Sequence, residues 1–196
     1  FLIFMNLIQT LLLGFIQGLA EFLPISSSGH LVLTQLLLGI NPPPYLFDIL
    51  VHLGTLGAVA IFFWDRIKKI DFNYLKHLLL ATLPLLVLGF LARNQLTALF
   101  SSKSLVLGCL LITAGLNFAT HHQLKTKPQN KGKFKLDWKK TLLIGLFQAL
   151  AIIPGISRSS STLFAAILLG YPRKQAFEFS FLISVPAILA ANLYQL

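Results

Sequence analysis

Acidic residues are scarce in this sequence. Its 196 residues include 6 Asp and Glu against 16 Lys and Arg, which leaves a net charge of +10. An excess of positive charge could indicate nucleic-acid binding, but there is no basic stripe with interleaved aromatic residues, so we exclude that partner. Cysteine occurs once, at Cys109, which excludes an internal disulfide. The sequence also lacks the P-loop, HExxH and GxSxG patterns, and with them the chemistries that those motifs carry.

Charged residues of either sign make up only 11% of the chain, whereas 56% of residues are hydrophobic. The apolar runs recur along the whole length, which is typical of an all-α polytopic membrane protein. The N-terminus has no basic region and no small-residue cleavage site ahead of the first polar loop, which argues against a removable signal peptide.

One stretch of the chain occurs twice. Residues 14–39 read GFIQGLAEFLPISSSGHLVLTQLLLG, and residues 145–170 read GLFQALAIIPGISRSSSTLFAAILLG, an alignment without gaps at an offset of 131. Each copy places a proline, a glycine and a run of hydroxyls inside an apolar segment, where interrupting a helix in lipid is costly. We therefore expect function at these two breaks.

The whole chain, 1–196, is predicted to be a single membrane domain built from this inverted repeat. Repeat 1, about 6–120, should hold a re-entrant hairpin and three spans: 6–40, then 46–64, 77–92 and 104–120. A polar cytoplasmic linker, 121–140, leads to partial repeat 2, 141–196, with a re-entrant hairpin over 141–170 and one span over 177–195. The second copy appears truncated, because a complete one would need roughly 60 further residues.

The hairpins are expected to be re-entrant because their helices are short. The segment 29–40 has twelve residues, about 18 Å of helix against a hydrocarbon core of about 30 Å. The basic residues then set the orientation, with thirteen of the sixteen on one side that should be cytoplasmic. These thirteen are Arg66, Lys68, Lys69, Lys76, the seven Lys of the linker, Arg173 and Lys174. Since three spans separate the hairpins, they enter from opposite sides and their tips can meet near the middle of the bilayer.

The tips suit an anion such as phosphate. We expect Ser28 or Gly29 to start the short helix after the first break, and Ser159 or Ser160 to start the one after the second, since serine favours N-caps. Two helix N-termini then direct N–H groups and positive dipole ends into one space. Arg158 adds a guanidinium that grips phosphate through two parallel hydrogen bonds; its alternative role is a structural ion pair with Glu21.

The two copies differ where chemistry would require it. Copy one has Glu21, Ser27 and His30 where copy two has Ile152, Arg158 and Ser161. A carboxylate, an imidazole, a hydroxyl nucleophile and a cation are a sufficient set for phosphoryl transfer. The residues alone leave the nucleophile open among Ser26, Ser27 and Ser28, which could instead cap the following helix.

The other polar residues leave several roles open. His30 could be a base, an acid, the nucleophile itself or a partner of a loop carbonyl, and Glu21 could hold a divalent cation or accept a proton. Gln17, one turn before Glu21, would position Glu21 or a phosphate oxygen. The remaining polar residues within or near spans are expected to have packing, interfacial or structural roles: His52, His77, His121, His122, Asp48 and Glu178.

At these residues the sequence resembles the undecaprenyl-diphosphate phosphatase family, integral membrane enzymes linked to bacitracin resistance. The similarity lies in QGLAE at 17–21 with PISSSGH at 24–30, in PGISRSSST at 154–162, and in FEFSFLISVP after the second loop. It implies hydrolysis of undecaprenyl diphosphate to undecaprenyl phosphate and inorganic phosphate in the bacterial plasma membrane, which recycles the lipid carrier for peptidoglycan synthesis.

The resemblance also implies residue roles and a cofactor. The implied functional residues are Glu21, Ser27, His30, Ser157, Arg158 and Thr162, with Gln17, Ser26, Ser28 and Ser159 as further candidates for diphosphate binding. A divalent cation, Mg²⁺ or Ca²⁺, is implied, with Glu21 as its candidate ligand; members often have Glu where Gln17 stands, which removes one possible ligand. The rival interpretation is a transporter or flippase for an anionic lipid, because inverted repeats with broken helices also serve transport; a non-catalytic remnant is a weaker one.

Overall fold

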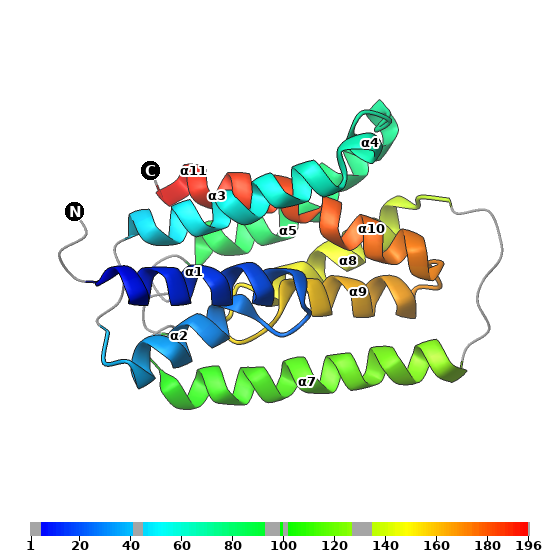
Figure 1. The fold of residues 1–196 in the computed structure, drawn as a ribbon. Coiled ribbons are helices and arrows are strands. Elements are labelled where there is room, and N and C mark those ends of the chain that lie inside the picture. Colours follow the sequence, from blue (N-terminus) through cyan, green and yellow to red (C-terminus); the bar gives the residue numbers. More distant parts are fainter. Residues whose placement is uncertain (1–4, 41–44, 93–98, 100–101, 127–134, 196) are drawn as a thin grey trace.

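The chain folds into a bundle of α-helices (Figure 1). The computed structural model describes residues 5–40, 45–92, 99, 102–126 and 135–195. Its helices are α1 (Leu7–Phe22), α2 (Ser27–Leu37), α3 (Tyr45–Phe62), α4 (Trp64–Ile67), α5 (Phe72–Leu91), α7 (Lys103–Thr126), α8 (Trp138–Leu150), α9 (Arg158–Leu168), α10 (Arg173–Leu182) and α11 (Ser184–Gln195).

Three helical segments of the described chain are long and apolar enough to cross a membrane: Phe72–Leu91, Lys103–Thr126 and Arg173–Leu193. Shorter apolar helices cover Leu7–Phe22 and Phe47–Phe62. The predicted class, an all-α polytopic membrane protein, is confirmed.

The repeated stretches form two helix hairpins, α1–α2 and α8–α9, that point toward each other. Figure 1 shows α1 and α8 entering the molecule from opposite ends, so that the turns after them lie together in its middle. α7 runs along both hairpins and contacts α2 and α9. The inverted arrangement therefore brings segments more than a hundred residues apart into one place.

The core lies between α5, α8, α9 and α10 and fixes the second hairpin. Ile144, Ala165 and Phe179 are fully buried there, and the ring of Tyr74 packs edge-on to that of Phe179 at 5.9 Å between centroids. Gly145 permits the close approach of α8 to α5, because a Cβ at this position would lie 2.5 Å from the Ala81 carbonyl oxygen.

Two predicted spans and the second predicted hairpin have bounds that differ from the expected ones. α5 starts at Phe72 rather than 77, because Asp71 caps it: its carboxylate accepts the Tyr74 N–H at 2.7 Å. α7 continues to Thr126, six residues into the predicted linker. α8 starts at Trp138 rather than 141, again because an aspartate, Asp137, caps it by accepting the Lys140 N–H at 3.0 Å.

The last predicted span, 177–195, agrees with the apolar segment Arg173–Leu193, but two helices form this segment. α10 ends at Leu182 and α11 begins at Ser184. Pro186 explains the break, since proline has no N–H to donate four residues back and its ring collides with that carbonyl. The hydroxyl of Ser184 donates to the Phe181 carbonyl at 2.6 Å and satisfies one of the groups that the break leaves open.

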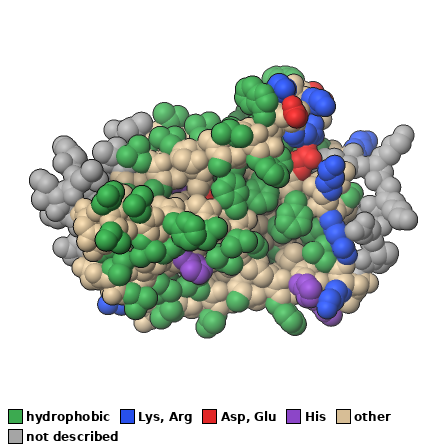
Figure 2. Space-filling view, in the orientation of Figure 1, with side chains coloured by type: hydrophobic (Ala, Val, Ile, Leu, Met, Phe, Trp, Pro, Cys, Tyr) green, Lys and Arg blue, Asp and Glu red, His purple; other side chains and the backbone are tan. Residues whose placement is uncertain are grey.

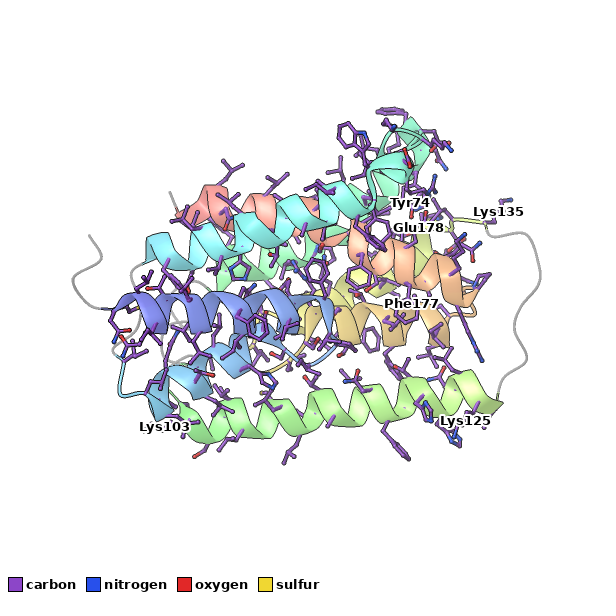
Figure 3. All side chains as sticks on the ribbon, viewed as in Figure 1. Tyr74, Lys103, Lys125, Lys135, Phe177 and Glu178 are labelled. Atoms are coloured by element: carbon purple, nitrogen blue, oxygen red, sulfur yellow. The ribbon has the colours of Figure 1, made fainter. Side chains whose placement is uncertain are left out.

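Charge gathers at one end of the molecule. In Figure 2 hydrophobic side chains cover the middle of the visible face, and most of its Lys and Arg lie at the end formed by α4 and the last turn of α7. Lys125 and Lys135 lie at this end and Lys103 at the other (Figure 3), as the predicted orientation requires. Lys103 and Arg93 are not among the thirteen basic residues assigned to the cytoplasmic side, and the sequence places both on the opposite side; Arg93 lies outside the described residues.

Candidate active site at the two helix breaks

Ser26 and Ser157, which the repeat aligns with each other, are the N-caps of α2 and α9. Ser26 Oγ accepts the Gly29 N–H at 3.3 Å, and Ser157 Oγ accepts the Ser160 N–H at 3.2 Å. The helices themselves start at Ser27 and Arg158, so the predicted starts at Ser28 or Gly29 and at Ser159 or Ser160 are wrong by one or two residues. Ser26 has φ = +70°, in the left-handed region that favours glycine, so the first break is strained at its cap.

The earlier caps place the candidate nucleophile and the candidate cation at equivalent positions. Ser27 is the first residue of α2, and Arg158 is the first residue of α9. The N–H groups at the first two positions of each helix, on Ser27 and Ser28 and on Arg158 and Ser159, take no part in the caps. Among the described residues they have no acceptor, so four donors remain for an anion.

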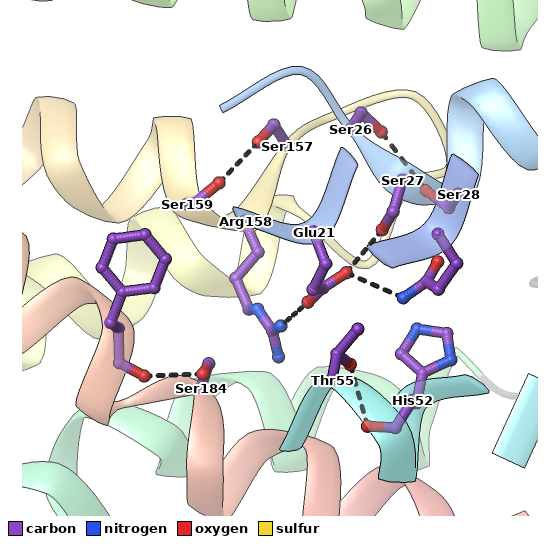
Figure 4. Close-up of polar contacts among 12 residues, drawn as sticks. Glu21, Ser26, Ser27, Ser28, His52, Thr55, Ser157, Arg158, Ser159 and Ser184 are labelled. Atoms are coloured by element: carbon purple, nitrogen blue, oxygen red, sulfur yellow. Dashed lines mark hydrogen bonds and ion pairs between the residues drawn. The ribbon is translucent and has the colours of Figure 1, made fainter. Parts of the chain in front are cut away.

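Glu21 joins the two breaks (Figure 4). One carboxylate oxygen, Oε1, accepts from the Arg158 guanidinium of the other hairpin in an ion pair. The other, Oε2, accepts from the Ser27 hydroxyl at 2.6 Å and from the Gln17 side-chain amide at 3.2 Å. The residues predicted from separate copies of the repeat thus form one connected group, and the alternative role of Arg158, pairing with Glu21, is present in it.

Thr113 on α7 holds the second break. Its hydroxyl donates to the Gly155 carbonyl at 2.7 Å and accepts the Ser157 N–H at 2.9 Å. Gly155 has φ = +95°, and a Cβ there would lie 2.5 Å from the Val106 carbonyl oxygen of α7. The backbone of the break therefore lies directly against the backbone of α7.

A single carbonyl of the first break, that of Pro24, receives two hydrogen bonds. Asn117, one turn after Thr113 on α7, donates its side-chain amide to this oxygen. The Ser160 hydroxyl of α9 donates to the same oxygen at 2.7 Å. Thr113, Asn117 and Ser160 thus position both breaks. Thr113 and Asn117 were not among the predicted site residues; the available signal was two polar residues four apart in an apolar span.

The histidines are arranged differently from the predictions. His30 Nδ1 bonds the Ser26 carbonyl at 2.8 Å, the loop-carbonyl role that was one of its alternatives, while Ser27 bonds Glu21 instead. His52 of α3, which the sequence analysis assigned to packing, lies beside Glu21 (Figure 4) and interacts electrostatically with its carboxylate. Its Nδ1 donates to the Asp48 carbonyl at 2.7 Å, so Nε2 is the nitrogen left for other partners.

The remaining candidate hydroxyls line the same breaks. Ser26 and Ser28 lie within hydrogen-bond distance at 3.3 Å, and Ser157 and Ser159 at 3.1 Å. Thr162 is buried, and its hydroxyl lies 2.9 Å from the Arg158 carbonyl oxygen and 2.5 Å from the hydroxyl oxygen of Ser180, which lines the pocket described below. All ten predicted site residues thus lie in or next to the two breaks, with Thr162 contacting backbone behind Arg158.

A pocket opens beside the ion pair. It is small, and part of it is open to solvent. Its lining comes from both repeats: Glu21, Phe22, Val59, Arg158, Ser159, Ser180, Phe181 and Ser184. The rings of Phe22 and Phe181 stack at 6.3 Å between centroids, so an apolar wall stands next to the charged pair. A charged group attached to an apolar chain is the kind of ligand that such a lining fits.

The Glu21 carboxylate does not fit a cation held by the protein alone. Both of its oxygens already accept hydrogen bonds, one of them from a guanidinium whose charge repels a metal ion. Within the part of the chain that the structure describes, no three His, Cys, Asp or Glu side chains lie close enough to bind a metal together. Gln17 Oε1 is buried and has no partner among the residues that the structure describes, but one neutral oxygen does not make a cation site.

The comparisons with known proteins agree with this geometry. Residues 10–196 match the family model described as bacitracin resistance protein BacA. The chain belongs to the BacA family. Among the curated relatives in this family is an undecaprenyl-diphosphatase of Halothermothrix orenii, 42% identical over 198 residues, which cover 98% of this chain and 75% of the relative.

Other relatives of the BacA family are similarly close. The undecaprenyl-diphosphatase of Pelotomaculum thermopropionicum is 43% identical over 203 residues, 98% of this chain and 76% of the relative. That of Chloroherpeton thalassium is 38% identical over 213 residues, with coverage of 98% and 75%. The resemblance found in the sequence is confirmed at the level of the family.

Proposed function

We propose that this protein hydrolyses undecaprenyl diphosphate to undecaprenyl phosphate and inorganic phosphate. The observation that carries the proposal is the group formed by Ser27, Glu21 and Arg158, which joins a nucleophile, a base and a phosphate-binding cation from two inverted hairpins. Relatives that share most of the chain have the corresponding name. The transporter alternative gains no support from them.

Ser27 is the proposed nucleophile. Its hydroxyl hydrogen already points to Glu21 Oε2 at 2.6 Å, so the carboxylate takes this proton as the oxygen attacks the terminal phosphorus. The bond from that phosphorus to the bridging oxygen breaks, and undecaprenyl phosphate leaves with the electron pair. Glu21 returns its proton to the departing phosphate, and the regenerated carboxylate then takes a proton from the water that hydrolyses the phosphoserine and releases inorganic phosphate.

Arg158 and the helix N-termini stabilise the transferring group. Protonation of Glu21 removes the negative charge that holds the guanidinium, which becomes available to phosphate oxygens as charge moves onto them. The N–H groups of Ser27, Ser28 and Ser159, which have no acceptor among the described residues, are further donors for an anion bound between the two breaks. Binding therefore strengthens as the reaction proceeds.

His30 is the alternative nucleophile. Acid-quenching the reaction with substrate labelled on the terminal phosphate separates the two, since phosphoserine survives acid and phosphohistidine does not. Label retained on a peptide containing 26–28 supports Ser27. Label that is lost in acid and kept in base assigns the covalent step to the histidine.

The implied divalent cation, Mg²⁺ or Ca²⁺, belongs to this proposal as a partner of the diphosphate oxygens, where it would offset their charge. The finer setting is proposed as well: a bacterial plasma membrane, multiple crossings with the basic end cytoplasmic, and recycling of the carrier for peptidoglycan synthesis, so that cell-wall growth, cell shape and bacitracin resistance depend on the activity. The substrate is a prenyl diphosphate lipid held among membrane lipids.

The test is phosphate release from a prenyl diphosphate by Glu21→Ala and Arg158→Ala. Each should lower the rate by about a hundredfold or more, since each removes a group that acts in the transition state. Arg66 and Glu178 form a second ion pair outside the pocket, so Arg66→Ala is the matched control and should keep the wild-type rate. Near-normal turnover in both Glu21→Ala and Arg158→Ala would remove the proposed site.

A further inference from the structure

α7 presents one narrow polar face to the two breaks. Its buried positions are Val106, Cys109, Thr113 and Thr120, and most of its other side chains are exposed. Thr113 is 2% exposed although it lies in the middle of an apolar span. A buried hydroxyl in such a helix needs partners, and those of Thr113 lie on another hairpin.

Thr113 bonds two backbone groups in the last residues of the turn that leads into α9. The bonded groups are the Gly155 carbonyl and the Ser157 N–H, and Ser157 is the cap that places Arg158 at the first position of the helix. Because the turn also touches the α7 backbone at Gly155, it cannot slide along α7 without losing both hydrogen bonds. The contacts with α7 thus fix the position of Arg158 along the axis of the bundle.

Asn117 does the same for the other hairpin. Its amide bonds the Pro24 carbonyl, two residues before the Ser26 cap and three before Ser27. Thr113 and Asn117 are one helical turn apart on the same rigid element, about 6 Å. One helix therefore sets the separation between the break that carries Ser27 and the break that carries Arg158.

We propose that Thr113 and Asn117 are positioning residues of the active site, which act by holding the two breaks at the separation required for phosphoryl transfer. The proposal rests on the proposed phosphatase function. Misplacing reacting groups by about 1 Å costs about a hundredfold in rate, whereas substrate binding by N–H groups and Arg158 tolerates more. The loss should therefore appear in kcat and not in KM.

Thr113→Val tests this with the shape of the side chain kept and both hydrogen bonds removed. Thr120→Val is the matched control. The Thr120 hydroxyl is buried on the same helix, but it donates to the Leu116 carbonyl of α7 itself, at 2.8 Å, and not to another hairpin. We expect kcat to fall about tenfold to a hundredfold in Thr113→Val with KM within about threefold. Thr113→Ser restores the hydroxyl and should return kcat to near the wild-type value.

Each outcome decides the matter. Wild-type kcat in Thr113→Val overturns the positioning role alone, and so does an equal loss in Thr120→Val, or a loss that Thr113→Ser does not reverse. Absence of phosphate release from the wild type overturns the proposed function and this inference with it. Asn117→Leu, read in the same assay, keeps the test open if Thr113→Val does not fold; unchanged kcat there counts against the proposal.

Discussion

Gly155→Ala should lower both the stability of the protein and its activity. Gly170→Ala is the control, because it has the same backbone strain without the steric clash. Both glycines have positive φ, +95° and +82°, so alanine costs about 1–2 kcal/mol at either position. At Gly170 the new Cβ meets nothing within 4 Å. At Gly155 it would lie 2.5 Å from the Val106 carbonyl oxygen and 2.7 Å from the Cys109 Cβ, which adds about 1–3 kcal/mol of overpacking.

The assay is thermal unfolding of the purified proteins in detergent, followed by phosphate release from the folded fraction. The extra cost at Gly155 corresponds to a midpoint about 2 to 12 °C below that of Gly170→Ala. Since the turn must move away from α7 to relieve the contact, Arg158 moves with it and activity should fall about a hundredfold. Equal midpoints and equal rates for the two variants would refute the argument that the second break rests on the α7 backbone.

Three more outcomes are expected. Ser27→Ala should lower phosphate release by about a hundredfold or more. Because Ser26 and not Ser27 caps α2, the loss of stability should be limited to that of the hydrogen bond to Glu21, about 1–3 kcal/mol; near-normal phosphate release would contradict this. Glu178→Gln should cost about 1–2 kcal/mol in thermal unfolding, since the Arg66 guanidinium loses its charged partner, and high salt should shrink the difference. The backbone N–H of Lys140 holds the pKa of Asp137 below its ordinary value, so this cap stabilises above the unfolded-state pKa and the gain is lost as pH falls through the folded-state pKa. Asp137→Asn should remove that dependence from acid unfolding curves, and two curves that stay parallel would speak against it.

The repeat made the site predictable. Two prolines with glycine and serine runs in apolar segments can only interrupt helices, and the count of spans between them requires the hairpins to oppose each other. Glu21, Ser27 and Arg158 were therefore expected in one place, and the structure brings them into contact. Breaks in lipid leave a strong local signal because few residue types tolerate them.

The sequence carries no comparable signal for the exact cap residue or for the neighbours of Glu21, and its signal for the break after Leu182 was overlooked. Three serines in a row all suit an N-cap, so only the backbone turn decides that Ser26 has this role. The position of His52 beside Glu21 depends on how α3 packs on α1, and no local sequence pattern encodes that packing. The break after Leu182 was readable from Pro186 and was missed because the span looked uniformly apolar.

The ion pair between Glu21 and Arg158 has a consequence for biogenesis. The two residues are 137 positions apart in the sequence, and ribosomes add about 5 to 20 residues per second, so the acid precedes its partner by roughly 7 to 27 seconds. Throughout that interval the first hairpin must be inserted with its carboxyl unmatched, and it can settle only once the later segments have left the translocon. The group that joins the two breaks therefore assembles only after the second hairpin has been made.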